Sequence, residues 1–229
     1  MKIENSKLKI AGNMPAEYKR GYANFLGCKI DLRFRPMIPR KETAFWVRQI
    51  IGKICKKGKK FTFLDLFSGS GCIGLIVLKK CSKWAKMGIF GDINKAFVKQ
   101  AKINLKLNRI NPSKYRAIQS DIFSKIHGKF DYIFANPPYV PEDNKYLVQQ
   151  SVLDWEPQSA IFGGQDGLLY IRKFLKDAKK YLNKGGKIFL EFDYFKKVEV
   201  EKLLHQFKYI NFTFHKDQFG KWRWLTISN

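Results

Sequence analysis

The sequence predicts an α/β fold with an open, mostly parallel sheet of seven strands and helices on both faces. From residue 61 onward, short apolar runs alternate with longer segments of helical periodicity. A glycine-rich turn joins the first apolar run to the first of these segments. Parallel strands need long crossover connections, which are usually helices. The alternating order is therefore typical of a doubly wound α/β domain.

Seven short apolar segments are predicted to be strands. The first of them, FTFLDLF, is almost continuously apolar, as expected where helices cover both faces of a sheet. In chain order, the predicted strands cover 61–67, 87–92, 115–121, 130–139, 187–193, 208–214 and 221–227.

Longer segments between the strands are predicted to be helices. Ala101 and Leu105, for example, stand four residues apart and share one side of such a helix. Another helix should stop before Gly185-Gly186, because glycine readily adopts the left-handed conformation that ends many helices. The predicted helices cover about 72–80, 95–107, 168–182 and 196–207, and a long loop is expected up to about residue 165.

Length and composition indicate one large domain with a short extension. The 229 residues are 45% hydrophobic, which is enough for a sizeable core. Residues 1–35 have too few apolar positions for their own core, so we expect an extension at 1–35 packed on a main domain at 36–229. No apolar run approaches the ~20 residues of a membrane span, and no secretory signal begins the chain. We therefore expect a cytoplasmic monomer without a membrane partner.

The four cysteines predict reduced thiols and no zinc site. Cys28, Cys55, Cys72 and Cys81 are separated by 27, 17 and 9 residues, and none forms a C-x-x-C pair. The three histidines are scattered and complete no set of metal ligands.

The chain is strongly basic, with 44 Lys+Arg against 19 Asp+Glu and a formal net charge of +25. Such a surplus is typical of proteins that contact polyanions, so a basic surface near RNA or the ribosome is one interpretation. Only nine of the 44 are arginine, the residue preferred for specific phosphate recognition. A compositional bias spread over solvated faces is therefore an equally open interpretation.

A glycine-rich loop after the first predicted strand indicates a cofactor site. Gly69, Gly71 and Gly74 form G-x-G-x-x-G, which lets the backbone approach a ligand at the start of a helix. Asp92 ends the next strand, where its carboxylate can accept both hydroxyls of a ribose. The pattern suits a dinucleotide as well as S-adenosylmethionine, and a capped tight turn is the structural alternative.

Two more carboxylates extend this candidate site. Asp121, after the third strand, can accept from an adenine amino group, and Ile122 or Phe123 beside it can cover the ring. Alternatively, Asp121 with Ser120 caps a turn. Asp65, just before the glycine loop, can orient that loop or meet the amino end of the cofactor.

The motif Asn136-Pro137-Pro138-Tyr139 ends the fourth strand, where a doubly wound sheet presents its ligand crevice. The two prolines hold the backbone rigid and extended. The Asn136 side-chain oxygen and the Pro137 carbonyl can both accept from an NH2 group, which localises its lone pair and aims it at a methyl sulfonium. The Tyr139 ring can pack on a planar amide or base. We therefore predict N-methyl transfer, with catalysis by Asn136, Pro137 and Tyr139 and substrate binding by residues 136–139.

These residues resemble the Rossmann-like class I S-adenosylmethionine methyltransferases that modify planar nitrogens, and several segments resemble the HemK/PrmC family. That family methylates the glutamine side chain of peptide-chain release factors. The resemblance covers roughly residues 24 to 229. It is carried by I-P-R-K-E-T at 38–43, D-L-F-S-G-S-G-C-I-G at 65–74, N-P-P-Y-V-P at 136–141, W-E-P at 155–157 and G-G-Q-D-G-L at 163–168.

The resemblance implies S-adenosylmethionine as cofactor, a methyltransferase domain at 36–229 and the G-G-Q glutamine of a release factor as substrate. We expect no metal, as the cysteine and histidine spacing indicates. The cofactor-binding residues that we expect are Asp65, Phe67, Ser68, Gly69, Ser70, Gly71, Asp92, Asp121, Ile122 and Asn136.

This sequence departs from the family pattern at four places. Phe67-Ser68 stands where Gly-Thr is usual, a change that backbone contacts should tolerate, and Lys41 replaces a proline. Glu191-Phe192-Asp193 lacks the glycine that commonly follows the glutamate by two. Family members usually carry a helical N-terminal domain, whereas about 35 residues precede I-P-R here.

Three other functions remain open from the sequence. The same chemistry can act on adenine N6 or guanine N2 of RNA or DNA. An NAD(P)-dependent oxidoreductase would explain the glycine loop and Asp92 but leaves N-P-P-Y unexplained. A catalytically silent cofactor-binding module is the third alternative.

Overall fold

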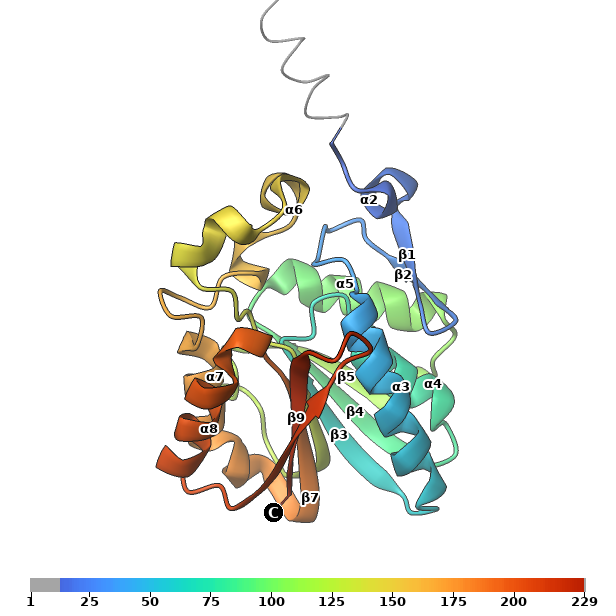
Figure 1. The fold of residues 1–229 in the computed structure, drawn as a ribbon. Coiled ribbons are helices and arrows are strands. Elements are labelled where there is room, and N and C mark those ends of the chain that lie inside the picture. The colour runs from blue at the N-terminus through green and yellow to red at the C-terminus, as the bar shows by residue number, and fades with distance from the viewer. Residues whose placement is uncertain (1–12, 229) are drawn as a thin grey trace, which may run out of the picture.

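A computed structural model describes residues 13–228, which form a seven-stranded sheet between two layers of helices (Figure 1). The strand order is β5-β4-β3-β6-β7-β9-β8, and β9 is antiparallel to both its neighbours, whereas the first five strands are parallel. The predicted fold class and strand number are confirmed. The strands are β3 (Phe61–Leu66), β4 (Ala85–Asp92), β5 (Tyr115–Gln119), β6 (Phe130–Ala135), β7 (Leu182–Glu191), β8 (Asn211–Lys216) and β9 (Trp222–Ser228).

Helices cover the two faces of this sheet separately, as Figure 1 shows with α3 and α4 on one side and α7 and α8 on the other. Phe63 of β3 belongs to the buried cluster under α3, α4 and α5, whereas its neighbour Leu64 belongs to the cluster under α7 and α8. Both residues are fully buried, which explains the apolar composition of this strand. The helices are α3 (Lys41–Lys56), α4 (Cys72–Lys80), α5 (Lys95–Leu107), α7 (Leu169–Ala178) and α8 (Lys197–Gln206).

The sheet reverses its winding direction at β3. From this central strand the chain first proceeds outward to β4 and β5 and then returns to the other side as β6 and β7. Connections on the two sides leave in opposite directions, which opens a crevice at the carboxyl ends of β3, β4 and β6. The fold therefore places Leu66, Asp92 and Ala135, the last residues of these strands, around one site.

The structure corrects two predictions about irregular segments. Strand β7 begins at Leu182, so Gly185-Gly186 lies inside it, next to a register shift against β6, and the preceding α-helix ends four residues earlier than expected. The long loop contains α6 (Gln150–Trp155) and short 3₁₀ turns. Helix α6 has no buried residue, so the sequence carries no apolar periodicity there.

The described part of the predicted extension is packed on the main domain. It contains α2 (Ala16–Arg20) and a hairpin of β1 (Tyr22–Phe25) and β2 (Cys28–Asp31). The backbone N–H of Asp31 donates to Asn104 Oδ1 at 2.7 Å, and Asn104 of α5 is completely buried. Residues 1–12 of the predicted extension lie outside the described residues.

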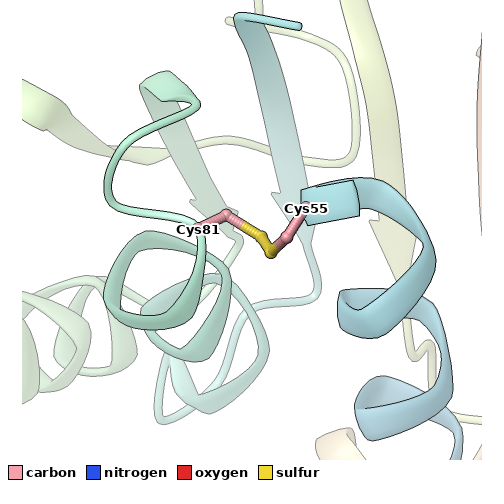
Figure 2. Close-up of a disulfide and its surroundings, with 2 residues drawn as sticks. All are labelled: Cys55 and Cys81. Carbon is pink, nitrogen blue, oxygen red and sulfur yellow. A yellow bond between two sulfur atoms is a disulfide. The ribbon is translucent and has the colours of Figure 1, made fainter. Parts of the chain in front are cut away.

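A disulfide joins Cys55 in the last turn of α3 to Cys81 just after α4 (Figure 2). The expectation of reduced thiols is wrong for this pair, because the two helices pack side by side and bring their carboxyl ends to a Cα–Cα distance of 5.4 Å. Cys28 and Cys72 are free and buried. Residues 13–228 include no group of three potential metal ligands and no helix long and apolar enough to cross a membrane.

Reduction of the Cys55–Cys81 disulfide should lower the free energy of unfolding by ~3 kcal/mol, because the bond restricts the unfolded chain across its sequence separation of 26 residues. Urea unfolding with and without dithiothreitol measures this difference. In a Cys55→Ala/Cys81→Ala double variant the reductant should have no effect. A wild-type midpoint that is insensitive to dithiothreitol would contradict the prediction.

Candidate active site

A cavity of about 210 Å³ lies at the carboxyl ends of the central parallel strands. It gathers most of the predicted site residues from four separate segments of the chain. Those in its lining are Phe67, Ser68, Gly69, Ser70, Asp92, Asp121, Ile122, Asn136 and Pro138. Asp65, Gly71, Pro137 and Tyr139 lie outside the lining.

Asp92 holds the glycine loop in place. Its Oδ2 accepts from the backbone N–H of Gly69 at 2.8 Å, and its Oδ1 accepts from that of Asn94 at 2.9 Å. Burial raises the pKa of Asp92, while these two N–H donors oppose the shift. Each oxygen keeps a lone pair for a further donor, so the carboxylate can bind a diol and fix the loop at the same time.

Gly71 is needed where the loop enters α4. Its φ is +75°, and a Cβ there would come within 2.9 Å of the Cβ of Ala101 on α5. Any side chain would push the loop away from the helix. The glycine therefore allows the close packing behind the cavity that positions the loop.

Asp65 lies behind the loop. Its Oδ2 accepts from the backbone N–H of Gly74 in the first turn of α4 at 2.8 Å, and the residue is 1% exposed. Burial raises the pKa of Asp65 to about 8. Of the two predicted roles, this contact supports orientation of the loop.

Asp121 and Ile122 also line the cavity. The Ser120 hydroxyl closes the turn here: it donates to the Ile122 carbonyl at 2.8 Å and accepts from the Lys125 N–H at 3.0 Å. The Asp121 carboxylate is therefore not needed to cap this turn and can face a ligand. Ile122 has a φ of +48°, a strained conformation for a β-branched residue.

The N-P-P-Y motif presents Asn136 and Pro138 to the cavity, whereas the Tyr139 hydroxyl donates to Glu191 at 3.1 Å. The glycine-rich segment that follows packs directly on this motif. A Cβ on Gly163 would approach the Pro138 carbonyl oxygen to 2.6 Å, so only glycine fits. The N-P-P-Y motif is thus held by the hydrogen bond from Tyr139 to Glu191 and by the close packing of Gly163 on Pro138.

Arg40, Thr43 and Tyr170 also line the cavity, although none of them was among the predicted site residues. Arg40 is bound by Glu156, whose buried Oε1 accepts from the guanidinium at 2.6 Å. This ion pair joins the I-P-R and W-E-P segments, 116 residues apart. Both segments contributed to the resemblance, but nothing in the sequence paired them. Tyr170 carried no signal.

Comparison with known proteins identifies the family. The Methyltransferase small domain family matches residues 48–158. Release factor glutamine methyltransferases from Lactococcus lactis and Bacteroides thetaiotaomicron are 33% and 32% identical, over 94% and 99% of this chain and 77% and 80% of their own lengths. This chain belongs to the release factor glutamine methyltransferase family. The predicted class of enzyme, a methyltransferase and not an oxidoreductase, is thereby confirmed.

Solved structures show the same fold at lower identity. A Thermus thermophilus 16S rRNA N2 G1207 methyltransferase, solved with AdoMet and guanosine, has a TM-score of 0.64 at 18% identity and covers 91% of this chain and 49% of its own. The hMettl16 catalytic domain, solved with an RNA hairpin, has a TM-score of 0.66 at 13% identity and covers 96% and 91%. At these identities the likeness shows the class I methyltransferase fold alone.

One departure from the family pattern has a structural consequence. Phe67, where glycine is usual, has a φ of +57°, in the left-handed region that costs a non-glycine residue ~1–2 kcal/mol. The prediction was that backbone contacts would tolerate phenylalanine in place of glycine here. The residue is accommodated with backbone strain, and its ring packs against Tyr170 and Phe174 at centroid distances of 6.1 and 6.4 Å.

The stability of the enzyme should decrease as pH rises from about 4 toward about 8. In this interval Asp65 keeps its proton in the folded state, with a pKa of about 8, and loses it in the unfolded chain, where the ordinary value is 3.8. Asp65→Asn cannot ionise and keeps an oxygen for the Gly74 N–H, so its decrease should be smaller. Urea unfolding of both proteins across this range tests the difference, and parallel pH profiles would contradict it.

Proposed function

We propose that this protein transfers a methyl group from S-adenosylmethionine to the side-chain amide nitrogen of the glutamine in the G-G-Q motif of peptide-chain release factors. The observation that carries the proposal is the meeting of Asn136, the glycine loop and Asp92 at one cavity, in a chain of this family. The methyltransferase domain is proposed to span residues 36–229, because all residues that line the cavity fall within it.

The residues in the cavity fit S-adenosylmethionine, which supplies an electrophilic methyl group on sulfur. The buried Ser68 hydroxyl has no hydrogen-bond partner among the described residues, and a Cβ on Gly69 would meet only the Phe67 carbonyl oxygen, at 4.0 Å. The loop backbone from Phe67 to Gly71 would hold the amino-acid end, with Asp65 fixing the loop from behind. Asp92 would accept the ribose hydroxyls, and Asp121 and Ile122 would bind the adenine.

At the acceptor end, the Asn136 side-chain oxygen and the Pro137 carbonyl would each accept one N–H of the glutamine amide. Both bonds weaken the overlap of the nitrogen lone pair with the carbonyl and direct it toward the methyl group. They also stabilise the positive charge that develops on nitrogen. The methylated amide is then strongly acidic and loses its proton without a dedicated base. Pro138 and Tyr139 would keep the acceptor plane in place.

The partner would be a release factor, and the enzyme would act on it as a cytoplasmic monomer. The net charge of +25 would favour encounter with an acidic substrate or with one bound near ribosomal RNA. Methylation of a nucleobase is the competing outcome of the experiments below.

Incubation with a release factor and S-adenosylmethionine should add the mass of one methylene group to the G-G-Q glutamine. Asn136→Ala should lower kcat by about 10²-fold or more, because one preorganised acceptor is lost. Calorimetry with S-adenosylhomocysteine should show a binding stoichiometry close to wild type, which confirms that the variant is folded. Mass spectrometry of the release-factor peptides provides the main readout. If S-adenosylmethionine with a radioactive methyl group labels RNA and leaves the release factor unlabelled, the proposed acceptor is refuted.

Added salt should lower kcat/KM for the release factor far more than it lowers the affinity for S-adenosylhomocysteine. The reason is that long-range attraction between charged surfaces is screened over about 10 Å at 0.1 M salt, whereas contacts inside a cavity are screened less. Initial rates at rising potassium chloride, beside calorimetry at the same concentrations, measure the two effects. If salt changes neither kcat/KM nor the cofactor-site affinity, the net charge of +25 plays no part in binding the release factor.

A further inference from the structure

Glu191, the last residue of β7, is a buried carboxylate that accepts three hydrogen bonds. Its Oε2 accepts from the indole Nε1 of Trp46 at 2.6 Å and from the Thr43 hydroxyl at 2.8 Å. Its Oε1 accepts from the Tyr139 hydroxyl at 3.1 Å. Glu191 is 1% exposed, so water does not compete for these bonds.

The three donors favour the ionised form of this carboxylate. An indole N–H can only donate, and in all three bonds the acceptor is an oxygen of Glu191. Burial raises the pKa of Glu191, while the bonds from Trp46 and Thr43 and the positive charge of Arg223 oppose the shift. Arg223 is itself paired with the buried Asp217 at 3.2 Å. The charge on Glu191 is therefore balanced chiefly by its own three donors.

The three donors come from two segments, α3 and the N-P-P-Y motif, that each contribute a residue to the cavity lining. Thr43, in the first turn of α3, is itself part of the cavity lining. Tyr139 follows directly on Pro138, which also lines the cavity. Glu191 therefore connects the wall made by α3 to the end of the N-P-P-Y motif, through bonds to side chains that are already part of the site.

Stability alone gives a weak reason for this arrangement. A buried charge carries a desolvation penalty of several kcal/mol, and apolar side chains of similar volume often stabilise a core equally well or better. The advantage of a carboxylate is geometric, since two oxygens with defined lone pairs fix three donors relative to one another. Such an advantage matters most beside a reaction that depends on orientation.

We propose that Glu191 is a positioning residue for methyl transfer, which fixes Tyr139 against α3 and thereby sets the orientation of the amide bound at N-P-P-Y. This inference rests on the proposed function, because it concerns the acceptor side of the same cavity. Glu191 itself lies outside the cavity lining and acts through Tyr139 and Thr43.

Glu191→Gln tests the proposal with almost no change in volume. The amide has one acceptor oxygen, so it cannot accept from Trp46, Thr43 and Tyr139 on both of its ends, and at least one of the three bonds is lost or reversed in direction. We expect kcat for the release factor to fall about 10- to 100-fold, as for other displacements of reacting groups by about 1 Å. KM for the release factor and the calorimetric stoichiometry for S-adenosylhomocysteine should stay close to wild type. A loss of folded protein would instead lower that stoichiometry.

Asp131→Asn is the matched control. Asp131 is a carboxylate near the amino end of β6, where it accepts from the Thr62 N–H at 2.7 Å and from Asn183 at 2.9 Å. It thus links segments as Glu191 does, but at the opposite end of the sheet from the cavity. Its replacement should leave kcat unchanged. An equal fall of kcat in both variants would overturn the positioning role.

Tyr139→Phe completes a double-mutant cycle with Glu191→Gln. If Glu191 acts through the Tyr139 hydroxyl, the double variant should lose little more activity than Glu191→Gln alone. Multiplied losses would show that the two residues act separately and would overturn the proposal.

Hydrogen exchange gives a readout that needs no substrate. Amide protons from Tyr139 to Val148 should exchange faster in Glu191→Gln than in wild type, and unchanged exchange would contradict the proposal even if activity falls. If the wild-type enzyme leaves the release factor unmethylated, the proposed function fails, and this measurement alone decides the role of Glu191. If the wild type is active and Glu191→Gln equals it, only the positioning role fails.

Discussion

The burial of β3 on both faces is the constraint on which the rest of this structure depends. Phe63 and Leu64 point to opposite helical layers, so neither layer can be absent without exposing apolar surface. Parallel neighbours on both sides then bring the carboxyl ends of β3, β4 and β6 to one edge. The glycine loop, Asp92 and Asn136 meet there because each directly follows or ends one of these strands. The chemistry of the site is thus a consequence of how the sheet is covered.

Buried carboxylates hold the site together at this edge. Asp65, Asp92, Glu156 and Glu191 are all less than 9% exposed, and each accepts hydrogen bonds from another segment of the chain. A carboxylate withdrawn from water must be satisfied by such donors, which makes it an effective and directional connection between segments. Burial also raises the pKa of all four carboxyl groups, so the geometry of the site is coupled to pH.

Local signals in the sequence predicted the strands, the glycine loop, Asp92 and Asn136, because each depends on residues close together in the chain. Contacts between distant segments could not be predicted in this way. The Cys55–Cys81 disulfide and the Arg40–Glu156 pair exist only because helices and loops pack together across 26 and 116 residues. Helix α6 was missed for a different reason, since it buries no residue and so leaves no periodic pattern.

Phe67 shows how a rule of local sequence can be broken at a functional site. Its left-handed backbone favours glycine, and the glycine loop would fold with less strain if glycine stood there. The aromatic ring, however, packs on Tyr170 and Phe174 of α7, a helix on the other face of the sheet from α4. A glycine at position 67 would have no side chain with which to contact α7. Phenylalanine ties that loop to the second helical layer, so that the two layers on opposite faces of the sheet are joined at the cavity itself.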